Sequence, residues 1–145
     1  MSTIRHLLET KGSQIFTIRP TESVLEATQV MNKRGVGALV VMDGRRVVGM
    51  LTERDVLRRV VGEELMPAAV RVEEVMTRDV ICCSPDTPID EASGILRDKR
   101  IRHLPVCNEE GKLIGLISIG DLNAYHASSQ QAQIHFLNEY VYGRA

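Results

Sequence analysis

The chain has 145 residues, of which 43% are hydrophobic and none is Trp, so its length and composition fit one compact domain with an aliphatic core. Its formal net charge of -1 lacks the basic field typical of nucleic-acid-binding proteins, and no apolar run reaches the roughly 20 residues that span a bilayer. The N-terminal residues MSTIRHLLETKG lack the apolar region of a signal peptide, so we expect a cytoplasmic protein that binds neither nucleic acid nor membrane.

The first half of the chain alternates strand-like and helix-like patterns. In order, it predicts a short helix at 3–11, a strand at 15–18, a helix at 22–34, a strand at 38–42, a return strand at 47–51 and a helix from Thr52 to about Val61. Gly12 and Gly35 are the expected helix stops, and Asp43-Gly44 is the expected turn of a hairpin between the last two strands.

The second half repeats this order, because residues 80–123 align with 15–57 after one extra residue in the second hairpin turn. It predicts a strand at 80–83, a helix from Pro88 to about Lys99, a strand at 103–107, a turn at 108–111, a strand at 112–117 and a helix from Ser118. Pro88 suits a first helical turn, where its missing N–H costs nothing. Each copy thus has the order β-α-β-β-α and leaves an apolar face that it cannot bury alone.

We therefore expect an α/β fold of two pseudo-symmetric repeats, at 12–62 and 80–127, that pack together through their sheets. The segment 63–79 is predicted to be a linker with a short helical turn of its own. The tail at 128–145 carries Ile134, Leu137 and Val141 at helical spacing, which predicts a C-terminal helix to accompany the N-terminal one. Two copies of a polar motif facing each other would form paired clefts, where ligands bind most often.

The reactive side chains do not suggest catalysis or a metal site. Cys82, Cys83 and Cys107 show no C-x-x-C spacing, and the adjacent pair cannot easily bridge, so we expect three reduced thiols. The histidines are scattered without metal-ligand spacing, and the chain has no Walker-type loop or nucleophile elbow. We therefore expect a protein that is not an enzyme and that carries no catalytic cofactor.

One polar motif follows each predicted return strand. It reads GMLTERD at 49–55 and GLISIGD at 115–121, so a hydroxyl at Thr52 or Ser118 precedes an aspartate at Asp55 or Asp121. This spacing is typical of a capping box, which only satisfies free N–H groups at a helix start. The same helix start attracts phosphate, and the aspartate can accept hydrogen bonds from both hydroxyls of a ribose. Because the motif occurs twice at matching places, we favour the nucleotide interpretation.

At these residues the chain resembles the CBS-domain family, named for cystathionine β-synthase. The resemblance rests on VEEVMTRDVICCSPDTPIDEA, RIRHLPV, GKLIGLIS and the twin [T/S]-x-x-D motifs, and it covers residues 12 to about 126. It implies a tandem pair, a Bateman module, whose two clefts bind adenosyl ligands such as AMP, ADP, ATP, NAD(H) or S-adenosylmethionine. It also implies frequent pairing of two modules into a disc-shaped homodimer.

The resemblance also implies which residues contact the nucleotide. In such modules the aspartate holds the ribose, the Thr or Ser contacts phosphate, and residues on the first strand and around the second contact the base. The implied positions are Thr17, Val36, Gly37, Ala38, Thr52, Arg54, Asp55, Cys82, Arg102, His103, Leu104, Pro105, Ser118 and Asp121.

The two implied clefts should not be equivalent. The resemblance aligns Thr17 with Cys82, and the stretch Val36-Gly37-Ala38 with Arg102-His103-Leu104. For Arg102 and His103 we favour contact with phosphate, which suits the planar donor fork of arginine. For Lys99 and Arg100 an ordinary solvated charge cluster is the plainer interpretation.

The sequence therefore predicts a stand-alone sensor of an adenosyl ligand. With no effector domain in 145 residues, the ligand state would pass to a separate, unidentified effector protein. The alternative is a non-catalytic interaction or dimerisation module whose capping boxes are only caps. A ligand that binds the folded state would raise the melting temperature, which separates the two.

Overall fold

The computed structural model describes residues 2–12 and 14–128. Its elements in chain order are α1 (Ile4–Lys11), β1 (Thr17–Ile18), α2 (Val24–Arg34), β2 (Ala38–Asp43), β3 (Arg46–Thr52), α3 (Glu53–Val56), a π-helix (Leu57–Val61), a 3-10 helix (Pro67–Ala69), α4 (Val72–Val75), α5 (Ile89–Lys99), β4 (His103–Cys107) and β5 (Leu113–Ser118). A further helix, called the last helix here, covers 119–128 and reaches the end of the described part. The tail helix predicted over 128–145 lies outside the described residues except for its first residue.

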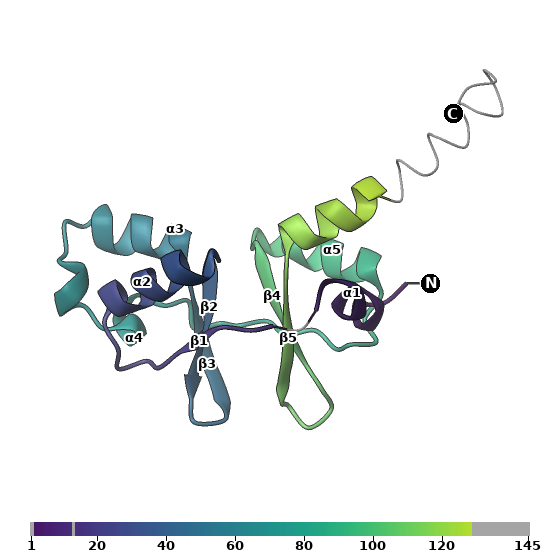
Figure 1. The fold of residues 1–145 in the computed structure, drawn as a ribbon, viewed down its shortest axis with the longest axis horizontal. Coiled ribbons are helices and arrows are strands. Elements are labelled where there is room, and N and C mark those ends of the chain that lie inside the picture. Colours follow the sequence, from purple (N-terminus) through teal and green to yellow (C-terminus); the bar gives the residue numbers. More distant parts are fainter. Residues whose placement is uncertain (1, 13, 129–145) are drawn as a thin grey trace, which may run out of the picture.

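The strands form two separate small sheets. In the first sheet β1 pairs parallel to β2, and β2 pairs antiparallel to β3; in the second, β4 pairs antiparallel to β5. Figure 1 shows the two sheets side by side at the centre of the molecule, with the helices on their outer sides. The predicted α/β fold of two pseudo-symmetric repeats is therefore confirmed.

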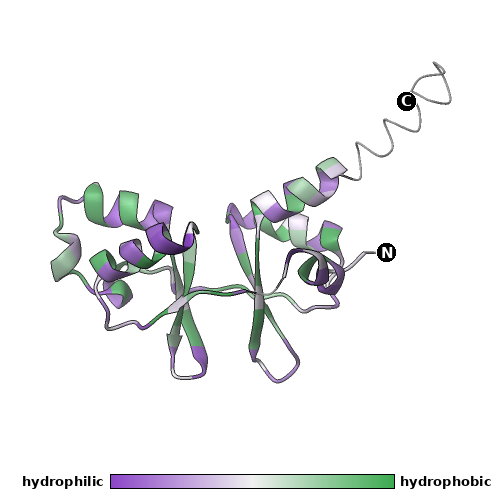
Figure 2. Cartoon of the chain, in the orientation of Figure 1, coloured by the Kyte–Doolittle hydropathy of each residue, from purple (hydrophilic) through white to green (hydrophobic). Residues whose placement is uncertain are grey.

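Three apolar clusters hold these layers together. One lies between the first sheet and its helices, and a second lies between the second sheet and its helices. The third joins the sheets: Ala38, Val40 and Met50 from the first repeat pack with Leu113 and Leu116 from the second. Figure 2 shows the strands largely apolar and the hairpin ends polar, as expected for strands buried on both faces. The repeats therefore pack through their sheets.

The core of each repeat includes a helix from the segment that precedes the other repeat. Ile4 and Leu7 of α1 are buried in the core of the second repeat, and Val72 and Val75 of α4 are buried in the core of the first. Figure 1 shows the same exchange, with α1 beside α5 and α4 beside α2. The chain thus crosses between its halves before each repeat starts, so a residue just ahead of one repeat can reach the motif of the other.

Local signals explain the ends of the repeat helices. The hydroxyl of Ser23 accepts a hydrogen bond from the N–H of Glu26 at 3.0 Å and caps α2. Gly35 ends this helix with a φ of 66°, a left-handed conformation that glycine adopts without strain. The equivalent residue after α5 is Arg100, which takes a φ of 56° despite its side chain.

The strand predicted at 80–83 is not formed, and this is the clearest difference between the repeats. It is reduced to one parallel bridge between Cys83 and Val106. In the first repeat the N–H of Val40 donates to the Phe16 carbonyl and extends the pairing of β1 with β2. The residue equivalent to Val40 is Pro105, which has no N–H to donate.

Several predicted boundaries shift by a few residues. β1 covers Thr17–Ile18 rather than 15–18, and α5 starts at Ile89 with Pro88 as its N-cap. The helix predicted from Thr52 changes at Leu57 into a π-helix, and the linker holds a 3-10 helix as well as α4. None of the described helices is long and apolar enough to cross a membrane.

Candidate functional site

Each [T/S]-x-x-D motif forms the start of a helix. At α3 the N–H of Thr52 donates to Oδ2 of Asp55 at 3.0 Å, and the hydroxyl of Thr52 accepts from the N–H of Asp55 at 3.2 Å. At the last helix Ser118 and Asp121 make the same pair of bonds, at 2.8 and 3.0 Å. Both motifs are therefore capping boxes, and any ligand contact would be additional to this local role.

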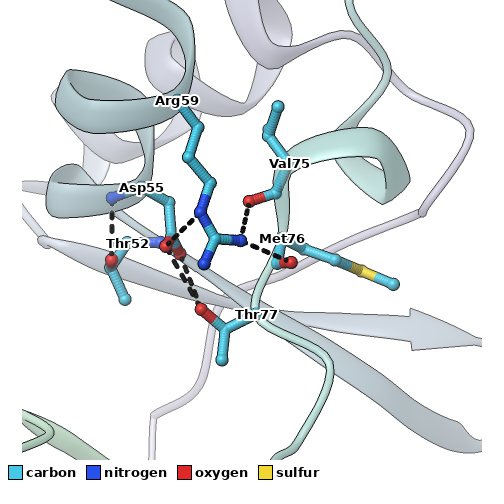
Figure 3. A network of polar contacts seen from close by, with 6 residues as sticks. All are labelled: Thr52, Asp55, Arg59, Val75, Met76 and Thr77. Carbon is cyan, nitrogen blue, oxygen red and sulfur yellow. Dashed lines mark hydrogen bonds and ion pairs between the residues drawn. The ribbon is translucent and has the colours of Figure 1, made fainter. Parts of the chain in front are cut away.

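The carboxylate of Asp55 is buried inside a network of protein donors, which Figure 3 shows. Asp55 is 7% exposed, and the Thr77 hydroxyl donates to its Oδ1 and Oδ2 at 3.2 and 3.4 Å. The guanidinium of Arg59 lies 4.0 Å from Oδ1 and donates to the carbonyls of Val75 and Met76 at 3.0 and 3.1 Å. The network thus ties the start of α3 to the end of α4 and the segment that follows it.

Asp121 has different partners, although it is equivalent to Asp55. Lys11, the final residue of α1, lies 2.9 Å from Oδ2 of Asp121 and also donates to the carbonyl of Leu116 at 2.7 Å. The Asp121 side chain is 27% exposed. Burial opposes its charge, but hydrogen bonds from Lys11 and Ser118 outweigh burial, so the pKa of Asp121 lies below its usual value of 3.8.

The sheet register corrects the alignment of the residues ahead of each hairpin. Ala38 faces Thr52, and His103 faces Ser118, so Ala38 is equivalent to His103. The carbonyls of Gly37 and Arg102 each accept the first N–H of the following motif helix, at 3.0 and 2.8 Å. The expected match of Val36-Gly37-Ala38 with Arg102-His103-Leu104 is therefore displaced by one residue. Each repeat helix ends at a left-handed residue, Gly35 or Arg100, and the strand starts three residues later in both repeats.

His103 sits beside the second motif as the first residue of β4. Burial lowers its pKa below the usual 6.5, and Arg102 lowers it further, against the opposing charges of Asp121 and Glu53. Its buried Nδ1 has no hydrogen-bond partner within the described residues. His103 therefore has one buried ring nitrogen without a protein partner, next to Ser118.

Comparison with known proteins identifies the family to which the two motifs belong. A family model described as "CBS domain" matches residues 5–62 and 72–127. The chain belongs to the CBS-domain family. It carries a tandem CBS pair.

Similar proteins cover most of the chain. A CBS-domain protein of known structure from Burkholderia ambifaria MC40-6 is 41% identical, with a TM-score of 0.84 over 89% of this chain and 96% of that one. The CBS-domain protein PAE2072 from Pyrobaculum aerophilum, solved in complex with AMP, is 26% identical, with a TM-score of 0.74 over 83% and 89%. The mitochondrial CBS-domain protein CBSX3 of Arabidopsis thaliana is 30% identical over 98% of this chain and 73% of its own.

The other candidate contacts of the CBS pair come from several elements, and Cys82 lies at the hairpin ends, at the opposite end of β4 from His103 and Ser118. Exposed or partly exposed positions are Thr17 on β1, Val36 and Gly37 before β2, Arg54 on α3, Cys82 after the linker, and Arg102 before β4. Ala38, Leu104 and Pro105 are buried in the strands. Leu104 belongs to the core of the second repeat, so a ligand would meet its backbone rather than its side chain.

Cys82, Cys83 and Cys107 are free thiols, and the first two have little tendency to ionise. Burial raises the pKa of Cys82 to about 11, helped by a hydrogen bond with Cys107, and burial raises that of Cys83 to about 12. Cys82 and Cys107 line a cavity of about 560 Å³ at the hairpin ends, together with Arg45 and Arg46. Within 2–12 and 14–128 no group of three or more His, Cys, Asp or Glu is placed to hold a metal ion.

Three residues that contact the aspartates were missed by the sequence analysis. Arg59 lies one helical turn after Asp55, a spacing that could have indicated the pair. Lys11 and Thr77 gave no such signal, because each comes from the segment ahead of the other CBS repeat. Their contacts depend on the crossing of the chain between the halves.

Proposed function

We propose that the CBS pair binds an adenosyl nucleotide between its repeats and acts as a regulatory sensor rather than as an enzyme. The observation that carries the proposal is the position of Asp121, a charged and partly exposed carboxylate at the start of a helix. A helix start favours phosphate, and a carboxylate one turn on can accept the ribose hydroxyls. The AMP complex of the Pyrobaculum protein, which shares this fold, supports AMP, ADP, ATP or NAD(H) as the ligand class.

The remaining candidate contacts keep their roles within this proposal. Ser118 would approach phosphate, with Arg102 and His103 adding donors at the second motif, and Thr52 holds the equivalent position at the first motif. Thr17, Cys82 and the residues ahead of β2 and β4 would surround the base. A cytoplasmic location, and the absence of nucleic-acid and membrane partners, stay predictions of the sequence.

The test is a thermal melt of the purified protein with AMP, ADP, ATP, NAD⁺, NADH and S-adenosylmethionine, with GMP and inorganic phosphate as controls. A ligand at one hundred times its dissociation constant stabilises the folded state by about 2.7 kcal/mol, which for this size of domain raises the melting temperature by roughly 5–10 °C. We expect at least one adenosyl ligand to do so. If all six leave the transition unmoved, the protein is not such a sensor.

That negative result would favour a second candidate function. Both motifs are already satisfied as capping boxes, and the Asp55 carboxylate is filled by protein donors. A CBS pair built in this way could serve as an interaction module without a ligand. A sensor, in contrast, must let its partner protein distinguish the liganded state from the empty one.

We also propose that two chains pair through the helical side of the first repeat. Leu57 and Val61 lie about one turn apart on the π-helix and are 63% and 58% exposed. Large exposed apolar side chains in a row are typical of an interaction surface.

If two chains pair in this way, light scattering should find a dimer in solution. The double variant Leu57→Asp/Val61→Asp should be monomeric, because association would bury two charges without partners. Leu65→Asp, at an exposed apolar residue beyond this row, is the control and should stay dimeric. A monomeric parent protein would contradict the proposal.

A further inference from the structure

The two capping boxes are equivalent in sequence, but the protein fills them differently. At the first motif both carboxylate oxygens of Asp55 accept from Thr77, one of them also accepts the Thr52 N–H, and the residue is 7% exposed. The Thr77 hydroxyl thus contacts the same two oxygens that would accept hydrogen bonds from the hydroxyls of a ribose. A ligand could use them only by breaking a buried hydrogen-bonded contact.

The second motif lacks this hydroxyl. Gly12 precedes Thr17 by the same interval as Thr77 precedes Cys82, so glycine occupies the position that threonine has at the other motif. Here Asp121 is contacted by Lys11, and both bonds, from Lys11 and from the Ser118 N–H, fall on Oδ2. Within the described residues no hydrogen bond reaches Oδ1 of Asp121.

The residues around the two motifs also favour a ligand at the second motif. The first helical residue after Thr52 is the acid Glu53, whereas the one after Ser118 is the apolar Ile119. Glu53 lies directly at the first helix start, where its like charge opposes a phosphate, although its charge also reaches His103 at the second motif. At the second motif His103 adds a buried Nδ1 without a partner among the described residues.

From these contacts we infer that the adenosyl ligand binds at the Asp121 motif in exchange for Lys11, while the Asp55 motif is a structural joint closed by Thr77. The inference rests on the proposed nucleotide function and names which of its two sites takes the ligand. Lys11 is a long and rotatable side chain that is 28% exposed, so it can leave Asp121 without disturbing the core. Binding would thereby free the end of α1 from the carboxylate.

The first test compares the two aspartates by calorimetry with AMP. Asp121→Asn keeps the shape of the side chain but loses the charged acceptor, and it should weaken AMP binding about tenfold or more. Asp55→Asn, the matched variant at the equivalent position, should leave the affinity of the folded protein nearly unchanged. Circular dichroism at the titration temperature confirms that each variant is folded.

The second test isolates Lys11 with adenosine, which offers the ribose without a phosphate that the lysine could attract. Lys11→Met removes the competing cation and should raise the affinity for adenosine roughly two- to fivefold. Lys99→Met is the control, because Lys99 is also the final residue of its helix but is not paired with Asp121. It should leave the affinity unchanged.

The outcomes separate this inference from the function on which it rests. If the parent protein binds neither AMP nor adenosine, and none of the six adenosyl ligands raises its melting temperature, the nucleotide function itself is wrong. If the parent binds, but Asp55→Asn rather than Asp121→Asn removes binding, the assignment of the two motifs is reversed. An unchanged or lower adenosine affinity in Lys11→Met would show that Lys11 does not compete with the ligand.

Discussion

Replacing Asp55 by alanine should lower the free energy of unfolding by about 2–4 kcal/mol, whereas Asp121→Ala should lower it by about 1–2 kcal/mol. The first substitution leaves the N–H of Thr52 and the hydroxyl of Thr77 without their acceptor in a buried site. The second removes bonds from Ser118 and Lys11 at a carboxylate that water reaches, so solvent replaces part of what is lost. Urea unfolding at neutral pH measures both changes.

The Thr77→Val variant shows whether the linker contact is the source of this difference. It removes the hydroxyl but keeps the shape, and it should cost about 0.5–1.5 kcal/mol in the parent protein. In the Asp55→Ala background the same change should cost close to nothing, because the hydroxyl has no acceptor left to lose. Equal losses from Asp55→Ala and Asp121→Ala would mean that Thr77 contributes little to the first motif.

Much of the fold could be predicted from local sequence patterns. The turn glycines Gly44 and Gly111 have φ angles of 64° and 78°, and they lie where the repeat places the hairpins. Gly35 ends α2 as the pattern predicts. The strand at 80–83 looked equally plausible, but pairing depends on the neighbouring strand, and Pro105 on that strand cannot donate.

The candidate site also combines local contacts, which the sequence predicts, with long-range contacts, which it does not. The spacing of Thr52 and Asp55 predicts a reciprocal cap, and the structure has one at each motif. The partners of the aspartates could not be predicted, because Lys11 and Thr77 reach them only after the chain crosses between the repeats. Local spacing fixes contacts within one helical turn, whereas contacts of this range depend on tertiary packing.

A second large effect is expected at Gly49, where the segment after α4 lies directly against β3. A Cβ at Gly49 would lie 2.6 Å from Sδ of Met76 and 2.8 Å from the backbone oxygen of Thr77. That oxygen accepts the N–H of Met50 at 2.9 Å, so backbone would have to move and a sheet-like pair would weaken. Gly49→Ala should therefore lower the free energy of unfolding by about 1–3 kcal/mol.

Gly115 is the matched control, because it is the equivalent glycine of the second repeat. A Cβ there would meet the end of the Leu8 side chain, with Cδ2 at 2.7 Å and Cδ1 at 2.9 Å, and no backbone atom is among these nearest contacts. Leu8 can rotate away, and alanine is favoured over glycine within a strand, so Gly115→Ala should change the stability by less than about 1 kcal/mol. Urea unfolding of both variants measures the difference. A loss in Gly115→Ala as large as in Gly49→Ala would mean that α1 is held against β5 as rigidly as the linker is held against β3.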